Sequence, residues 1–153
     1  EYLQNHLRIL SAFYGILKPM DGVTPYRLEM QAKAEIEEKT NLYDYWGNRL
    51  YHSVIDDSRT IINLASKEYS KCIERYLSDK DNYITITFCE LSGDKLVTKG
   101  TYAKMARGEM VRFMAENNIE NPVDIQKFDR LGYTFRGNLS SETEYVFERK
   151  IIK

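Results

Sequence analysis

The sequence is poor in the residues that hold metal ions or cross-link small folds. Its 153 residues include two cysteines and two histidines, and the spacing of Cys72 and Cys89 matches no zinc motif. Two scattered cysteines suit the reduced thiols of a cytosol better than a disulfide framework. We therefore expect no metal held by side chains, no bound cofactor and a cytoplasmic location.

Long apolar runs and a net positive charge are missing as well. No segment approaches the roughly 20 apolar residues that span a bilayer, so we expect no membrane partner. The formal net charge at pH 7 is −1, which provides no global basic field to attract nucleic acid. Any contact with nucleic acid must come from a local basic patch or from residues outside this sequence.

The signatures of common enzymes are also absent. No Gly-rich phosphate loop, nucleophile elbow or pair of metal-binding histidines occurs along the chain. A length of 153 residues fits a single domain over 1–153 with a sizeable buried core. Because the sequence starts at Glu1 and not at methionine, we expect a fragment that lacks an N-terminal part.

Strand-like and helix-like patterns alternate along the chain, with hairpins as well as crossovers. This alternation predicts an α+β or mixed α/β fold, with a mixed central sheet and helices packed on its faces. Helices are expected over 41–55, from Ser66, over 102–117 and from Pro122. Strands are expected over 7–14, 26–30, 59–65, 83–91, 95–102, 133–135 and 144–149.

One candidate anion site is the predicted turn from strand to helix at Asn63–Tyr69. Ligands tend to bind at the carboxyl ends of strands in such sheets, and free N–H groups at a helix start attract anions. Ser66 would cap the helix, Lys67 can reach a phosphate, and Asn63 is a polar residue inside an apolar strand. The alternative is structural: Ser66 only caps, Asn63 satisfies nearby backbone and Lys67 faces water.

A second candidate is the alternating segment Tyr26–Met30, where Arg27 and Glu29 share one face of a short predicted strand. A guanidinium there can clamp a phosphate or carboxylate with two hydrogen bonds. Glu29 or Glu68 can act as an acid or base if it is buried. Alternatively, Arg27 and Glu29 pair with other charges across the sheet.

The longest predicted helix has an apolar face and, next to it, a stripe formed by Lys104, Arg107 and Gly108. Glycine inside a helix costs about 1 kcal/mol relative to alanine, and here it would let a phosphate approach closely. Alternatively, Gly108 accommodates a packed neighbour and the cations face water. The expected core residues of this helix are Ala103, Ala106, Met110, Phe113 and Met114.

Aromatic residues are a further part of the candidate site. Tyr14, Tyr26 and Trp46 can line a pocket or stack on bases. Packing in the core is the alternative interpretation of the same side chains.

Several strings of residues, in one order over nearly the whole chain, follow the pattern of one family. They are Leu10–Asp21, Pro25–Met30, Asn41–Gly47, Asn63–Tyr69, Ala103–Gly108, Phe128 with Gly132–Phe135, and Phe147 with Arg149. On these strings the chain resembles the YaaA family of peroxide-stress proteins. It differs from the family pattern at Ala12, where glycine is usual, and at Lys18, where arginine is frequent.

The resemblance implies a cytoplasmic bacterial protein with an unusual α/β fold that limits damage during hydrogen peroxide stress. It also implies a lower level of free intracellular iron and binding of DNA through a positively charged cleft. Contacts of this kind are salt-dependent and largely independent of sequence. The residues expected to hold the phosphates are Lys18, Arg27, Asn63, Ser66, Lys67, Lys104 and Arg107.

Two other functions fit the same residues. One is an enzyme that acts on a nucleotide or damaged base, with Glu29 or Glu68 as acid or base and Arg27 as anion clamp. Its pocket would combine Arg27 and Glu29 with Asn63 and Lys104. The other is direct storage of iron, although no carboxylate pair has di-iron spacing on adjacent helices.

Overall fold

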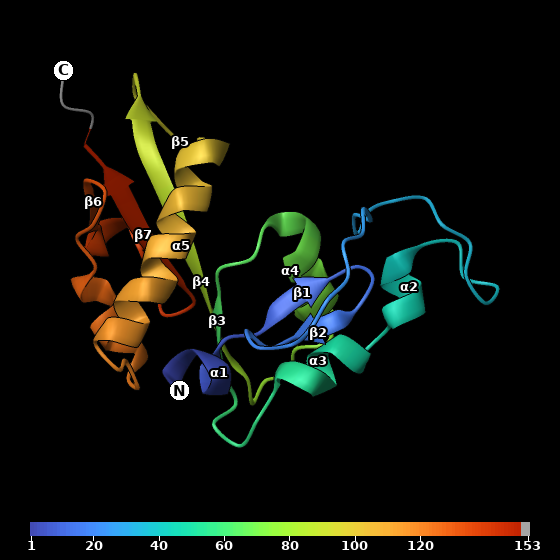
Figure 1. Cartoon of the computed structure of the whole chain (residues 1–153). Helices are drawn as coiled ribbons and strands as arrows, with labels where there is room; N and C mark the ends of the chain where they lie inside the picture. Colours follow the sequence, from blue (N-terminus) through green and yellow to red (C-terminus); the bar gives the residue numbers. More distant parts are fainter. Residues whose placement is uncertain (151–153) are drawn as a thin grey trace. The chain divides into compact units, whose positions relative to one another are not determined.

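The computed structural model describes residues 1–150, which form two compact units (Figure 1). Unit 1 comprises Glu1–Ile61 and Ala65–Asn82, and unit 2 comprises Ile62–Leu64 and the chain from Tyr83 onward. Each unit is described by itself, and the single-domain organisation expected for 1–153 stays a prediction. The expected α+β class with a mixed sheet is confirmed.

A mixed sheet of five strands contains most of the strands in the described chain. Its order is β3 (Thr60–Asn63), β4 (Asn82–Ser92), β7 (Glu144–Arg149) and β6 (Tyr133–Phe135). The fifth strand, β5 (Lys95–Val97), pairs with β4. β4 and β7 run parallel, with Phe88 opposite Phe147, whereas β6 is antiparallel to β7. The predicted closing hairpin of β6 and β7 is therefore confirmed.

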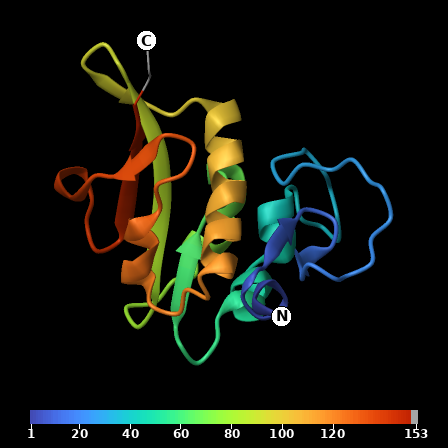
Figure 2. The ribbon, with the colours of Figure 1, turned by 60° about the vertical axis from the view of Figure 1, so that its left-hand side comes forward.

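Helix α5 (Gly100–Glu116) packs against one face of this sheet, as Figure 2 shows. Alternate residues of β4 and β7 point toward the helix, because successive side chains of a strand face opposite sides. Four of the five residues expected on the core face of α5 are buried, and Met114 packs against the cluster. The core of unit 2 consists of Ile84, Ile86, Phe88, Ala103, Ala106, Met110, Phe113, Ile125, Phe128, Tyr133, Tyr145 and Phe147.

Two short 3₁₀ helices, η1 (Pro122–Lys127) and η2 (Gly137–Leu139), complete unit 2. The helix expected from Pro122 thus has 3₁₀ geometry. The strand expected over 95–102 is shorter than predicted, since β5 ends at Val97 and α5 already begins at Gly100. None of the helices within residues 1–150 has the length and apolar character needed to cross a membrane.

Unit 1 consists of short helices around one two-stranded hairpin. Helix α1 (Tyr2–His6) precedes the antiparallel strands β1 (Ile9–Ser11) and β2 (Gly15–Leu17). The helices α2 (Leu42–Trp46), α3 (Arg49–Val54) and α4 (Lys67–Glu74) follow. Buried residues of this unit include Ala12, Met30, Leu42, Leu50, Tyr51, Cys72 and Ile73.

Three sequence predictions for unit 1 are wrong. The strand expected over 7–14 is wrong in its extent: β1 covers only Ile9–Ser11, because the chain reverses at residues 12–14, before Gly15 with its φ of 82°, and returns as β2. The helix expected over 41–55 is two helices, broken where Gly47 adopts a φ of 53°. Residues 26–30 alternate in sequence but form no strand, since no neighbouring strand pairs with them. Arg27 and Glu29 therefore do not share the face of a sheet.

Candidate functional site

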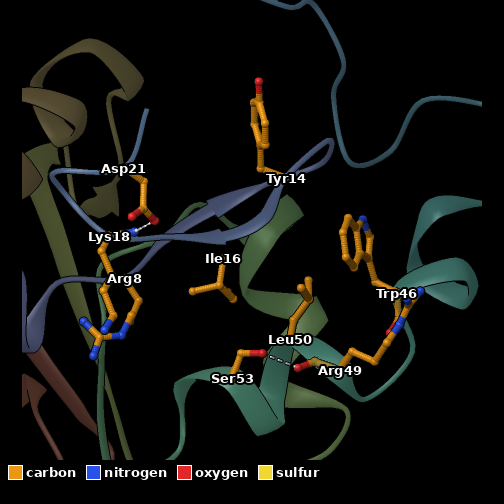
Figure 3. A pocket seen from close by; sticks show the side chains of 9 residues that line it. All are labelled: Arg8, Tyr14, Ile16, Lys18, Asp21, Trp46, Arg49, Leu50 and Ser53. Carbon is orange, nitrogen blue, oxygen red and sulfur yellow. Dashed lines mark hydrogen bonds between the residues drawn. The ribbon is translucent and has the colours of Figure 1, made fainter. Parts of the chain in front are cut away.

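Unit 1 contains an open pocket of about 460 Å³ between its hairpin and helix α3 (Figure 3). In Figure 3, Arg8, Lys18 and Asp21 lie at one end, Trp46 and Arg49 lie at the other, and Ile16 and Leu50 lie between them. We call this cavity the unit 1 pocket. Its lining consists of Arg8, Tyr14, Ile16, Lys18, Asp21, Trp46, Arg49, Leu50 and Ser53.

Trp46 is fixed in this pocket by backbone contacts. Its indole N–H donates to the carbonyl oxygen of Ala12 at 2.9 Å. A Cβ atom placed on Gly15 would lie 2.9 Å from two carbons of the indole ring, so only glycine leaves room for the ring there. Helix α2, which carries Trp46, begins at Asn41, whose side chain accepts a hydrogen bond from Asp44 N at 2.9 Å. Asn41 thereby caps α2.

Both arginines of the pocket are positioned by carbonyl oxygens at helix ends. Nη1 of Arg8 donates to Leu7 O at 2.9 Å and to Gln4 O at 3.3 Å, beside the end of α1. Nε of Arg49 donates to Trp46 O at 3.1 Å, and its guanidinium carbon lies 5.1 Å from the centre of the Trp46 ring. Because a guanidinium has five N–H donors, each side chain keeps donors that can bind a ligand.

Lys18 and Asp21 belong to the loop that follows β2. The backbone N–H of Lys18 donates to Oδ2 of Asp21 at 2.8 Å, which closes a tight turn. The ammonium group of Lys18 takes no part in this hydrogen bond. The hydroxyl of Tyr14 accepts a hydrogen bond from Thr24 N at 2.9 Å and lies 3.0 Å from Thr24 Oγ1. The hydroxyl of Thr24, followed by its backbone N–H, lowers the pKa of Tyr14.

In unit 2, Lys104, Arg107 and Gly108 form what we call the α5 basic stripe. Lys104 is exposed and Arg107 is half-buried, and burial lowers the pKa of Arg107. Neither side chain forms an ion pair within residues 1–150. The carboxylates on the same helix are occupied elsewhere, because Arg130 pairs with Glu109 at 3.3 Å and with Glu116 at 2.5 Å.

The space next to Gly108 is open. A Cβ atom placed on this residue would have no atom within 4 Å. The idea that Gly108 accommodates a packed neighbour is therefore wrong, and the backbone of α5 is accessible beside Lys104 and Arg107. On α5 itself, an anion approaching there would meet two cations, while both carboxylates of this helix are paired with arginines.

The remaining residues predicted in unit 1 lie outside the unit 1 pocket. Arg27 and Glu29 are exposed on the segment before Met30. Oε1 of Glu68 accepts a hydrogen bond from Gln31 N at 3.3 Å. Burial raises the pKa of Tyr69, and the charges of Glu68 and Glu29 add to this effect, so both carboxylates lie near that ring.

Tyr26 and the turn residues have mainly structural contacts. The Tyr26 hydroxyl lies 2.5 Å from Ser11 Oγ, and its ring stacks on Phe13 with centres 5.3 Å apart. Ser66 precedes α4 as its N-cap, but its side chain makes no capping hydrogen bond, contrary to expectation. Asn63 is buried, and its Nδ2 donates to Thr85 Oγ1 at 3.3 Å. Lys67 is exposed in the first turn of α4.

The structure therefore brings together some of the predicted residues within each unit. Tyr14, Lys18 and Trp46 line the unit 1 pocket, and the α5 basic stripe lies in unit 2. A single cleft that joins Lys18 and Arg27 to Lys104 and Arg107 combines both units and stays a prediction, as does the enzyme pocket that combines Glu29 with Lys104.

Sequence reasoning missed Arg8, Asp21, Arg49 and Ser53 of the pocket lining. Arg49 carried a usable signal, since it follows two residues after the glycine that ends α2 and is thereby turned back toward Trp46. Arg8 carried none. Within residues 1–150, no group of three or more histidine, cysteine, aspartate or glutamate side chains could hold a metal ion.

Comparison with known proteins places the chain among bacterial proteins of one group. A family model described as peroxide stress protein YaaA matches residues 1–139. A UPF0246 protein of Agathobacter rectalis is 80% identical over 151 residues, which cover 99% of this chain and 61% of that protein. A UPF0246 protein of Lachnoclostridium phytofermentans is 57% identical over 147 residues, covering 96% of this chain and 58% of the relative. The chain thus spans about three fifths of the length of these relatives.

Proposed function

Because the chain belongs to the family of the peroxide stress protein YaaA, we propose that it binds DNA through phosphate contacts and so protects DNA during peroxide stress. The α5 basic stripe is the single observation that carries this proposal. A phosphate oxygen at Gly108 can approach the helix backbone, since the space beside that residue is open. The charged groups of Lys104 and Arg107 are then the nearest counterions.

The electrostatics of the stripe favour an anionic partner. Burial already removes part of the water from Arg107 and lowers its pKa, a cost that no carboxylate of the described chain offsets. A phosphate would supply the missing counter-charge and accept two parallel hydrogen bonds from the guanidinium. Lys104 adds a compact charge one helical turn away.

Other predicted residues would contribute phosphate contacts of their own. Lys67 and Arg27 are exposed and form no ion pair within residues 1–150, as expected of side chains that meet a phosphate backbone. Ser66 is the N-cap of α4, directly before Lys67, and Asn63 lies three residues before Ser66. We propose that these residues are further contacts to DNA phosphates, made by their own units.

A salt titration tests the proposal. Binding of the intact protein to duplex DNA is measured at about 50 mM and 200 mM salt for the wild type and for the double variant Lys104→Gln/Arg107→Gln. Each phosphate contact contributes about 0.9 to the slope of log K against log salt, so the double variant is expected to lose about 2 in slope. The matched control is Lys127→Gln, because Lys127 already pairs with Asp124 at 2.7 Å. An unchanged slope in the double variant contradicts the proposal.

The proposal has a cellular part as well. We propose that the protein limits both free iron and DNA breaks after hydrogen peroxide, as its family membership suggests. A strain without the protein is expected to accumulate more of both. Complementation with Lys104→Gln/Arg107→Gln is expected to restore the iron level and to leave the DNA breaks elevated. Full protection of DNA by that variant would remove the α5 basic stripe from the function.

A further inference from the structure

We propose that the unit 1 pocket binds a small organic anion with a planar ring, of the chemical class of a nucleoside monophosphate. The phosphate would lie at the end formed by Arg8 and Lys18, and the ring would lie over Ile16 and Leu50 toward Trp46 (Figure 3). This inference goes beyond the proposed function, because no residue of the α5 basic stripe takes part in it.

The charges of the pocket lining select an anion. Arg8, Lys18 and Arg49 face the single carboxylate of Asp21, which leaves a net charge of +2. Within residues 1–150, none of the three cations forms an ion pair. Asp21 lies at the same end as Arg8 and Lys18, and Arg49 lies at the other end. A phosphate monoester carries a charge of about −1.5 to −2 at pH 7, which matches the excess of the whole lining, whereas a carboxylate would neutralise only half of it.

The cationic end is arranged in advance. Arg8 is half-buried, and two backbone carbonyls hold its Nη1, so its remaining N–H groups have a fixed direction. The turn closed by Lys18 N and Asp21 Oδ2 places the Lys18 side chain at the same end. A preorganised guanidinium loses less conformational entropy when it binds a ligand.

The middle and far end of the pocket suit a planar ring. Ile16 and Leu50 provide an apolar floor, and Trp46 is held by its hydrogen bond to Ala12 O and by its packing on Gly15. The guanidinium of Arg49 lies over the rings of Tyr45 and Trp46, at 4.8 Å and 5.1 Å from their centres. Aromatic and guanidinium planes are the groups on which nucleobases stack.

The size of the pocket agrees with this class of ligand. Its volume of about 460 Å³ lies within the range of about 300–1,000 Å³ for pockets that bind small molecules. Such pockets combine apolar walls with a few polar groups that fix orientation. Here the apolar part and the cationic part are contiguous, which a phosphate ester with an attached ring would use and inorganic phosphate would not.

Trp46 is the one tryptophan of the sequence, so its emission reports occupancy of the pocket. The intact protein is titrated with AMP, adenosine and inorganic phosphate, and binding is measured by Trp46 fluorescence and by calorimetry. AMP is expected to bind about tenfold more tightly than either adenosine or phosphate, a ratio worth 1.4 kcal/mol. If inorganic phosphate binds as tightly as AMP, the proposed contact between the pocket and the ring is wrong. If AMP up to about 10 mM changes neither the Trp46 emission nor the heat of binding, the whole proposal is overturned.

Variants separate the pocket from the DNA-binding surface. Lys18→Gln is expected to weaken AMP binding about tenfold, and the exposed lysine of α4 in the same unit, changed as Lys71→Gln, is the matched control. Arg8→Gln is a second test, with thermal unfolding to verify that α1 stays folded. Equal AMP affinity in Lys18→Gln and Lys71→Gln overturns the proposal. Lys104→Gln/Arg107→Gln is expected to bind AMP like the wild type, so the two proposals fail independently.

A nucleoside monophosphate can be free or can be the 5′ end of a DNA strand. An oligonucleotide with a 5′ phosphate is therefore compared with the same strand lacking it, in competition with AMP. A strand that displaces AMP only when phosphorylated identifies the strand end as the ligand. If neither strand displaces AMP, the ligand of the pocket is the free nucleotide.

Discussion

Arg149, the last residue of β7, donates two hydrogen bonds to the same carboxylate oxygen of Glu90 on β4. The distances to Glu90 Oε2 are 3.0 Å from Nε and 2.5 Å from Nη2. Lys99, just before α5, pairs with the other oxygen at 2.5 Å, and the Arg149 guanidinium lies 3.7 Å from the centre of the Tyr102 ring. This network joins the ends of two parallel strands to the start of the helix that carries the α5 basic stripe.

Removal of Arg149 is expected to destabilise unit 2 strongly. Glu90 is almost fully buried, and without Arg149 its Oε2 atom loses both hydrogen bonds while the carboxylate keeps the cost of desolvation, which Lys99 alone offsets only in part. In urea unfolding, Arg149→Met is expected to lower the midpoint much more than Arg112→Met does. Arg112 is the matched control, because its ion pair with Glu116 is exposed at 2.7 Å and such pairs contribute little. Equal shifts of the two midpoints contradict this account.

The contact between Gly15 and Trp46 predicts a second effect. Gly15→Ala would place a side chain at a φ of 82° and a Cβ atom 2.9 Å from the indole ring. The left-handed backbone alone costs about 1–2 kcal/mol for a residue other than glycine, and the ring must also move. We expect lower stability and altered Trp46 emission. Gly22→Ala is the control, since a Cβ atom there has no atom within 4 Å; similar behaviour of both variants would rule out the contact.

Periodic features of this fold could be predicted from the sequence, and single backbone angles could not. The 3.6-residue spacing of Ala103, Ala106 and Met110 predicts the buried face of α5, and Glu144–Arg149 is a strand as expected. The alternation in 26–30 has the same form but no partner strand. A strand requires a neighbour, and the pattern of one segment does not say whether a neighbour exists.

Of the two candidate sites, the α5 basic stripe could be predicted from the sequence and the unit 1 pocket could not. Lys104, Arg107 and Gly108 lie within one helix, so helical spacing alone brings them together. The unit 1 pocket depends on the reversal of the chain at Gly15 and on the break at Gly47. Of the two arginines that were missed, Arg49 is marked in the sequence by the glycine two residues before it, whereas no sequence rule places Arg8 in the pocket.

The carboxylate of Asp81 predicts how unit 1 responds to acid. Although burial would raise its pKa, hydrogen bonds from Ser78 N at 2.7 Å and Tyr51 Oη at 2.8 Å, with the ion pair to Arg59, lower the pKa from 3.8 to about 2. The ionised form is thus favoured in the folded chain. Its stabilising contribution is complete above about pH 4 and is lost as the pH falls through about 2.

Asp81→Asn is therefore expected to lower the stability of the protein at pH 7. The difference in urea midpoint between this variant and the wild type should narrow below about pH 4 and vanish only when the pH is well below 2, where the Asp81 carboxyl is protonated and both side chains are neutral. Asp79→Asn is the matched control, because Asp79 is exposed and two residues away. A difference in midpoint that stays constant with pH would show that shape, and not charge, is what Asp81 contributes.

The two cysteines are expected to be unreactive toward hydrogen peroxide, even in a member of a peroxide-stress family. Burial raises the pKa of the Cys72 thiol to about 11 and also raises that of Cys89. Since the thiolate is the reactive form, only about one Cys72 in ten thousand is reactive at pH 7.

Oxidation of the native protein should be at least about tenfold slower than that of free cysteine. The protein unfolded in guanidinium is the control, and its two thiols should react like free cysteine. Rapid oxidation of the native protein would instead show that one of these buried thiols is exposed often enough to act as a peroxide sensor.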